Sequence, residues 1–230
     1  SSDVCSSDLI FNTLSGNGYS AQQNFNTIQS ILLPQTSGTT PLYFLMPPNN
    51  TQFINARVRA LHTTVDPNYT YGYITAAVEF FCPNPLYYNN NTQTATMAYL
   101  PPTGRTYNRV YNLVYDPATA IITTTVTNNG WATTYPVIDI NGPIANPIVG
   151  NYTQNAYLQF DCTLTDTDHL VIDLYNKLVT LNGLPARNLL TNGTWFSASP
   201  GNNEYYLDGD FGSTLIGTTK AVVTWNSAYV

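Results

Sequence analysis

The chain has 230 residues and a formal net charge of −6, and only 9% of its residues are charged, whereas about a quarter is usual in soluble domains. Two Lys and five Arg provide no basic surface, which excludes binding to a nucleic acid backbone or to an anionic membrane as the main activity. No apolar run in the sequence approaches the roughly 18 residues of a membrane-spanning helix.

The composition favours strands and the turns between them. The sequence contains 33 Thr, 27 Asn and 18 Tyr. Thr and Tyr fit the half-buried surface of a sheet, and Asn, Gly and Pro favour turns. We therefore expect a mainly β protein whose surface is polar but largely uncharged.

The first nine residues, SSDVCSSDL, share neither the composition nor the periodicity of the rest of the chain. We expect residues 1–9, which include Cys5, to be a non-native leader that arose as a sequencing artefact, or else a disordered terminus. In both cases this segment has no function. The authentic protein would then continue upstream of Ile10.

One amphipathic helix is predicted over residues 21–33. Ser20 and Gln23 have the spacing of a capping box, and the apolar residues after them recur at helical intervals. Pro34 prevents the helix from continuing.

Two strands are predicted after this helix. Residues 53–61 and 73–82 both alternate between apolar and polar side chains, so they read as an antiparallel pair. Residues 42–46 form a third, shorter strand that ends at two prolines. We interpret residues 10–88 as a small α+β domain.

The pattern weakens after this domain. Residues 89–117 are rich in Pro, Asn and Tyr and contain one further candidate strand at 94–100, so we interpret them as a linker. Residues 118–230 then form a succession of short strands separated by turn signals. The predicted strands cover residues 121–126, 136–140, 157–165, 169–175, 178–181, 205–207 and 221–229. Such spacing predicts an antiparallel β-sandwich or a closed barrel.

The two histidines are the first place to look for chemistry. His62 lies beside two threonines, and His169 ends the segment DTDH at residues 166–169. This segment reads either as a metal or acid/base cluster, or as an exposed hairpin whose Asp side chains bind their own backbone, and we favour the hairpin.

The acidic residues give little support for catalysis. The sequence has two Glu. We expect Glu79 on the outward face of a strand and Glu204 in a turn, where neither is a buried acid. Asp208 and Asp210, in DGDFG, match only part of a calcium loop. We expect no catalytic residue, no metal site and no cofactor.

Aromatic residues offer a candidate glycan contact. Trp131 follows the turn NNG, and Trp131, Tyr205 and Tyr206 could together form a stacking platform for sugar rings. The alternative is that these rings pack loops or face a neighbouring subunit, while Trp195 and Trp225 belong to the core. Cys82 and Cys162 could form a bridge, but their positions in strands favour buried thiols.

Several segments, taken in order, resemble the distal tail proteins of siphophages, which are also described as phage tail family or minor tail proteins. The segments are VEFFCPNPLYY at 78–88, TGRTYNR at 103–109, YPVIDINGPIANPIVGN at 135–151, YLQFDCTL at 157–164, HLVIDLYNKLVTLNG at 169–183, WFSASPGNNEYYL at 195–207 and AVVTWNSAYV at 221–230. Asn84 stands where the family more often has Asp.

The resemblance implies a C-terminal β-sandwich that is galectin-like or similar to a carbohydrate-binding module, preceded by a partial ring-forming domain. It also implies that the full-length protein forms a hexameric ring, which joins the tail tube to the tail-tip proteins in the virion. Our first hypothesis is therefore a structural protein without enzymatic activity. The alternative is a virion module that binds carbohydrate on the host surface, and a cell-wall hydrolase is a third possibility that we do not expect.

Overall fold

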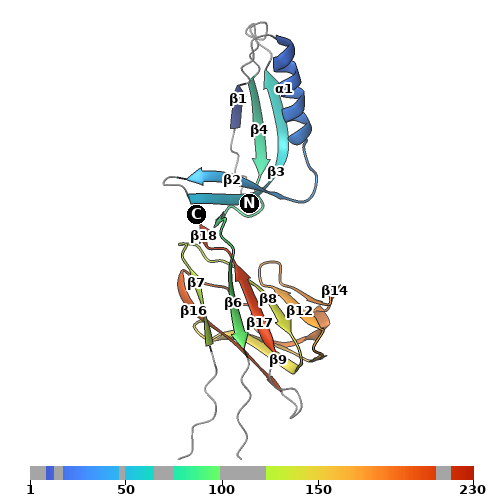
Figure 1. Cartoon of the computed structure of the whole chain (residues 1–230), viewed down its shortest axis with the longest axis vertical. Helices are drawn as coiled ribbons and strands as arrows, with labels where there is room; N and C mark the ends of the chain where they lie inside the picture. Colours follow the sequence, from blue (N-terminus) through green and yellow to red (C-terminus); the bar gives the residue numbers. More distant parts are fainter. Residues whose placement is uncertain (1–8, 13–17, 47–49, 65–74, 99–122, 211–218) are drawn as a thin grey trace, which may run out of the picture. The chain divides into compact units, whose positions relative to one another are not determined.

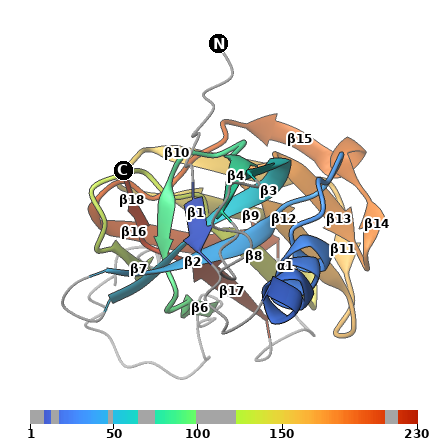
Figure 2. The same ribbon diagram turned by 90° about the horizontal axis from the view of Figure 1, so that it is seen from above.

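The computed structural model describes residues 9–12, 18–46, 50–64, 75–98, 123–210 and 219–230. The chain divides into two compact units, which are residues 1–88 with Val230 and residues 89–229. The helices and strands of both units are drawn in Figures 1 and 2. Each unit has a hydrophobic core of its own. No helix in the described part of the chain is long and apolar enough to cross a membrane.

The first unit is a sheet with one helix. Its elements are β1 (Leu9–Asn12), α1 (Gly18–Ile31), β2 (Thr40–Met46), β3 (Asn50–Thr64), β4 (Thr75–Phe81) and β5 (Tyr87–Asn89). The strands follow the order β1-β4-β3-β5, and β2 pairs with β3. The pairing of β3 with β4 is antiparallel, which confirms the pair predicted over residues 53–61 and 73–82. The helix begins three residues earlier and ends two residues earlier than the predicted range 21–33.

Strand β3 is long because its two halves pair with different partners. Thr40 to Met46 of β2 lie opposite residues 50–56, and β4 lies opposite residues 57–64, with an irregularity between Val58 and Ala60. The alternating apolar residues of β3 and β4 form the core of this unit, and Phe25 brings the helix against Ala76. Strand β1 was not predicted, and its first residue, Leu9, belongs to the segment expected to have no function.

The second unit is built from many short strands. They are β6 (Gln93–Ala98), β7 (Thr123–Asn128), β8 (Val137–Asn141), β9 (Ile144–Asn151), β10 (Ala156–Phe160), β11 (Thr163–Leu164), β12 (His169–Asp173), β13 (Leu178–Leu181), β14 (Leu184–Pro185), β15 (Leu190–Gly193), β16 (Gly201–Asp210), β17 (Lys220–Trp225) and β18 (Ala228–Tyr229). A short 3₁₀ helix, Arg187–Leu189, precedes β15.

All of these strands except β18 form two sheets. Sheet I has the order β15-β10-β9-β16-β7, with β11 also paired to β9, and sheet II has the order β14-β13-β12-β8-β17-β6. Apolar side chains from both sheets form one continuous core, which includes Ile138, Leu158, Ile172 and Val223. This arrangement confirms the predicted antiparallel β-sandwich.

Some strands differ from the predictions. The segment 157–165 is divided into β10 and β11. Strand β9 was missed, because Pro147 lies within it and Asn146 has a positive φ of 49°, and both interrupt the usual strand pattern. Glu204 was expected in a turn and instead lies inside β16, so that prediction is wrong. The proposed linker motif at 103–109 lies outside the described residues.

The two described cysteines carry thiols rather than a disulfide. Cys82 is buried in the core of the first unit, as predicted. Cys162 follows β10 instead of lying inside a longer strand, and it is only half-buried against the core of the second unit.

Candidate binding surfaces

The DTDH segment forms the turn between β11 and β12. The Asp168 carboxylate accepts hydrogen bonds from Asn182 Nδ2 at 2.8 Å and from the backbone N–H and the hydroxyl of Thr165, each at 2.7 Å. These bonds lower the pKa of Asp168 to about 2, with the Asn182 amide as the largest cause. The carboxylate therefore stabilises its own turn, as the hairpin interpretation predicts.

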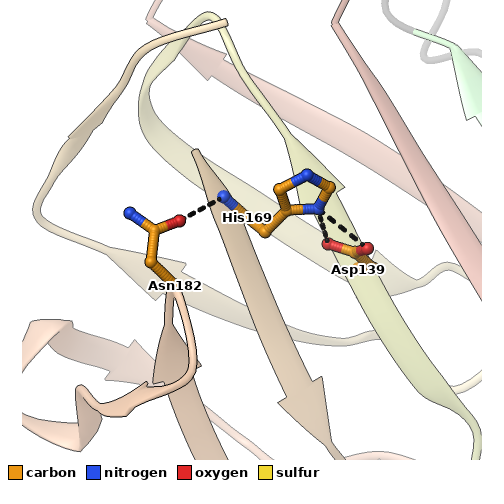
Figure 3. Close-up of polar contacts among 3 residues, drawn as sticks. All are labelled: Asp139, His169 and Asn182. Carbon is orange, nitrogen blue, oxygen red and sulfur yellow. Dashed lines mark hydrogen bonds and ion pairs between the residues drawn. The ribbon is translucent and has the colours of Figure 1, made fainter. Parts of the chain in front are cut away.

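His169 lies at the start of β12 (Figure 3). Its Nδ1 atom lies 3.1 and 3.2 Å from the two carboxylate oxygens of Asp139, and its backbone N–H donates to Asn182 Oδ1 at 2.9 Å. Asp139 on the adjacent β8 thus orients the imidazole. A nucleophilic triad would need a Ser or Cys against this ring, and the groups brought together here are an aspartate and an asparagine. His62 is an exposed residue of β3, in the other unit.

The remaining acidic candidates also make local contacts. Glu79 forms an ion pair with Arg59 at 3.0 Å, and Glu204 accepts a hydrogen bond from the Thr125 hydroxyl at 2.9 Å. Asp208 accepts one from the backbone N–H of Gly209 at 2.8 Å, and Asp210 is the last residue of β16. Among the described residues, no group of three or more His, Cys, Asp or Glu side chains is arranged to hold a metal ion.

Trp131 is the most exposed aromatic residue of the predicted glycan platform. Its side chain is 70% exposed, and its ring meets that of Tyr229 edge to face, with 4.9 Å between the ring centres. The loop that carries it is held in place by the buried amide of Asn128, which donates to the carbonyl oxygens of Ala132 and Ala198. An exposed ring is thus held in a fixed position, as a binding residue would be.

Tyr205 and Tyr206 do not form a shared platform with Trp131. Tyr205 is fully buried and packs edge to face against Phe196 in the core, so its expected role as a glycan contact is wrong. Tyr206, the next residue along β16, points to the opposite side of sheet I and is half-buried. Burial raises the pKa of Tyr206, and nearby Asp208 and Tyr157 raise it further.

The other tryptophans take the structural roles expected of them. Trp225 is buried, and its Nε1–H donates to the Thr127 carbonyl at 2.9 Å. Trp195 packs against the core of the second unit, and the Arg187 guanidinium lies 4.6 Å from its ring centre.

Sequence reasoning missed two residues that lie beside Tyr206. Gly150 on β9 lies opposite Tyr157 on β10 and opposite Tyr206 on β16, so the three residues form one row across sheet I. Gly150 was partly indicated by the sequence, since an isolated Gly within a strand often marks the close approach of another group. The row itself depends on strand pairing, which local sequence does not reveal.

Comparisons with known proteins bear on the second unit. Residues 129–229 match the family model of the siphovirus-type tail component, C-terminal domain. Two structures of the phage P2 baseplate in its activated conformation, one with Ca and one with Sr, each contain a chain similar to this one. Each of these two matches has a TM-score of 0.47 and 9% sequence identity, and covers 96% of this chain and 86% of the other. No curated protein matches the chain.

The family match covers most of the sandwich, including the loop of Trp131 and every strand of the two sheets except β6 and β7. It confirms the resemblance noted in the sequence segments from residue 135 onward. Residues 129–229 are thus similar to the C-terminal domain of siphovirus-type tail components.

Proposed function

We propose that this protein is a structural component of the baseplate hub, without enzymatic activity, that assembles as a hexameric ring between the tail tube and the tail-tip proteins. The observation that carries the proposal is the match of residues 129–229 to a siphovirus-type tail component. As such a component the protein is part of the virion, and we place it at the tail tip. The Asp168 carboxylate stabilises its own turn and Glu204 binds the neighbouring Thr125 hydroxyl, which supports a role without catalysis.

The first unit offers a surface for ring contacts. On β2, Leu42 and Phe44 pack against the core of this unit, whereas Tyr43 and Leu45 point outward, and Leu45 is 72% exposed. Among the described strands, β2 pairs only with β3, so its other edge is open. Exposed apolar side chains beside an open strand edge favour association with another chain.

Light scattering after size-exclusion chromatography tests this proposal. The full-length protein should have a mass six times that of one copy, and Leu45→Lys should shift the population to smaller species because it places a charge in the apolar contact. Leu184→Lys is the matched control, since Leu184 is 71% exposed in the second unit and should leave the mass unchanged. A stable monomer at micromolar concentration would contradict ring formation.

A second candidate function is carbohydrate binding on the host surface. The observation that favours it is the exposed Trp131 ring on a loop fixed by buried hydrogen bonds. A glycan array with the wild-type chain and Trp131→Ala tests this function. Saturable binding that is lost in the variant would support it, and the absence of such binding would remove Trp131 as the contact.

A further inference from the structure

The outer face of sheet I has an unusual feature at its centre, where Tyr206 covers Gly150. A β-carbon added to Gly150 would lie 2.5 Å from Cε1 of Tyr206 and 2.6 Å from both its Cζ and its hydroxyl oxygen. The ring therefore lies across strand β9, in the space that any other side chain would fill. Glycine inside a strand is less favourable than alanine, and here it leaves room for an aromatic ring.

Hydrogen-bonding side chains surround this ring. Glu204 and Asp208 lie two residues to either side of Tyr206 along β16, so they point to the same face. On β10, Tyr157 lies beside Gly150, and its hydroxyl accepts a hydrogen bond from Asn192 Nδ2 at 3.2 Å.

The next row across the sheet adds further polar groups. This row crosses four strands and pairs Asn192 with Gln159, Gln159 with Ile148, and Ile148 with Asp208. An aromatic ring is thus bordered by carboxylate and amide groups, on strands that are fixed by the sandwich core beneath them. Such a surface matches a sugar ring, which presents C–H groups on its face and hydroxyl groups at its rim.

The charge of the second unit narrows the class of ligand. Its described residues contain eight Asp or Glu and three Lys or Arg. Asp208 lies close to Tyr206, and Glu204 lies two residues from it along β16. A carboxylate accepts hydrogen bonds from hydroxyl groups but repels phosphate, sulfate and carboxylate groups. The surface is therefore complementary to an uncharged saccharide rather than to an anionic polymer.

We propose that the outer face of sheet I binds a neutral oligosaccharide, with the Tyr206 ring on Gly150 as the stacking surface and Asp208 and Gln159 as partners for the sugar hydroxyls. This inference rests on the second candidate function, carbohydrate binding, and places the binding site on a sheet face instead of on the Trp131 loop.

The test uses the full chain and two groups of defined probes in solution NMR titrations. The neutral probes are di- to tetrasaccharides of glucose, galactose, rhamnose and N-acetylglucosamine, and the anionic probes are glycerol phosphate oligomers and uronic acid oligosaccharides. The wild-type chain should bind at least one neutral probe saturably at concentrations up to about 10 mM, and should bind the anionic probes more weakly.

Two variants perturb the ring in different ways. Tyr206→Ala removes the stacking surface and should weaken binding about tenfold, as expected for the loss of roughly 1.4 kcal/mol. Gly150→Ala keeps the tyrosine but pushes its ring off the strand, and should weaken binding by a similar factor while the circular dichroism spectrum stays unchanged. Tyr135→Ala is the matched control, because Tyr135 is an exposed tyrosine that packs against Tyr175 elsewhere in the sandwich.

The outcomes separate this inference from the proposals on which it depends. Binding that is lost in Trp131→Ala but retained in Tyr206→Ala would support carbohydrate binding and overturn the site proposed here. Preference for the anionic probes, or equal affinity of the wild type and Gly150→Ala, would also overturn it. Absence of saturable binding to every neutral probe would overturn both carbohydrate proposals and leave ring assembly untouched.

Discussion

Replacement of Asn128 by alanine should destabilise the second unit and release the loop that carries Trp131. The Asn128 side chain is 1% exposed. Its Nδ2 donates to the carbonyl oxygens of Ala132 at 2.8 Å and Ala198 at 3.1 Å, and its Oδ1 accepts from the backbone N–H groups of Gly130 at 3.1 Å and Ala228 at 3.3 Å. One side chain thus joins three separate segments of the chain.

The magnitude can be worked out from these four contacts. A typical hydrogen bond contributes about 1 kcal/mol net, and buried backbone groups that lose their partner cost about 1–3 kcal/mol each. Some of the released groups lie at the edge of the loop and can bind water instead. We therefore expect Asn128→Ala to lower the free energy of unfolding by about 3 kcal/mol.

Equilibrium unfolding in urea, followed by tryptophan fluorescence, measures this loss. The exposed neighbour Asn129 provides the control, and Asn129→Ala should change the free energy of unfolding by less than about 0.5 kcal/mol. Quenching by iodide gives a second readout of the Trp131 loop in the folded variant. A loss below about 1 kcal/mol for Asn128→Ala, with unchanged quenching, would show that this amide does not hold the loop.

The pKa of Asp168 is lowered to about 2 from an ordinary value of 3.8. The ionised carboxylate therefore stabilises the fold above about pH 4, and this contribution is lost as the pH falls toward 2. Asp168→Asn should therefore make the free energy of unfolding depend less steeply on pH in this range, and identical slopes for variant and wild type in acid unfolding experiments would refute the assignment. In a Cys5→Ser background, Cys162 should react with a thiol reagent before the buried Cys82, and its rate should rise above pH 9 because burial raises its pKa. Faster labelling of Cys82 in the native protein, measured by mass spectrometry of the labelled peptides, would contradict the burial of these thiols.

Alternation of apolar and polar residues was enough to locate β3, β4, β12 and β13, because these strands have one face in a core and one face outside. Strand β9 was not found from the sequence, since Asn146 bends the backbone and Pro147 is itself buried. Its position between β10 and β16 depends on pairing between distant segments, and local periodicity contains no information on that pairing.

The candidate site was likewise predictable from the sequence only in part. Tyr205 and Tyr206 are consecutive in a strand, so alternation alone places their rings on opposite faces and excludes a platform made of both. The packing of the Tyr206 ring over Gly150 could not be predicted, because it depends on the register of β9 against β16. Trp131 was found because an aromatic residue after a turn signal is exposed in many loops, and its exposure is confirmed.

The first and last segments of the sandwich are joined to each other. The backbone N–H of Asn89 donates to the Ser227 carbonyl at 3.0 Å, and Asn226 Nδ2 donates to the Asn89 carbonyl at 2.8 Å. The polypeptide therefore enters and leaves this module at neighbouring points, a geometry that permits a whole module to be inserted or exchanged within a host chain. A module whose two ends lie side by side can be exchanged for another with the same spacing of ends, without lengthening the segments on either side.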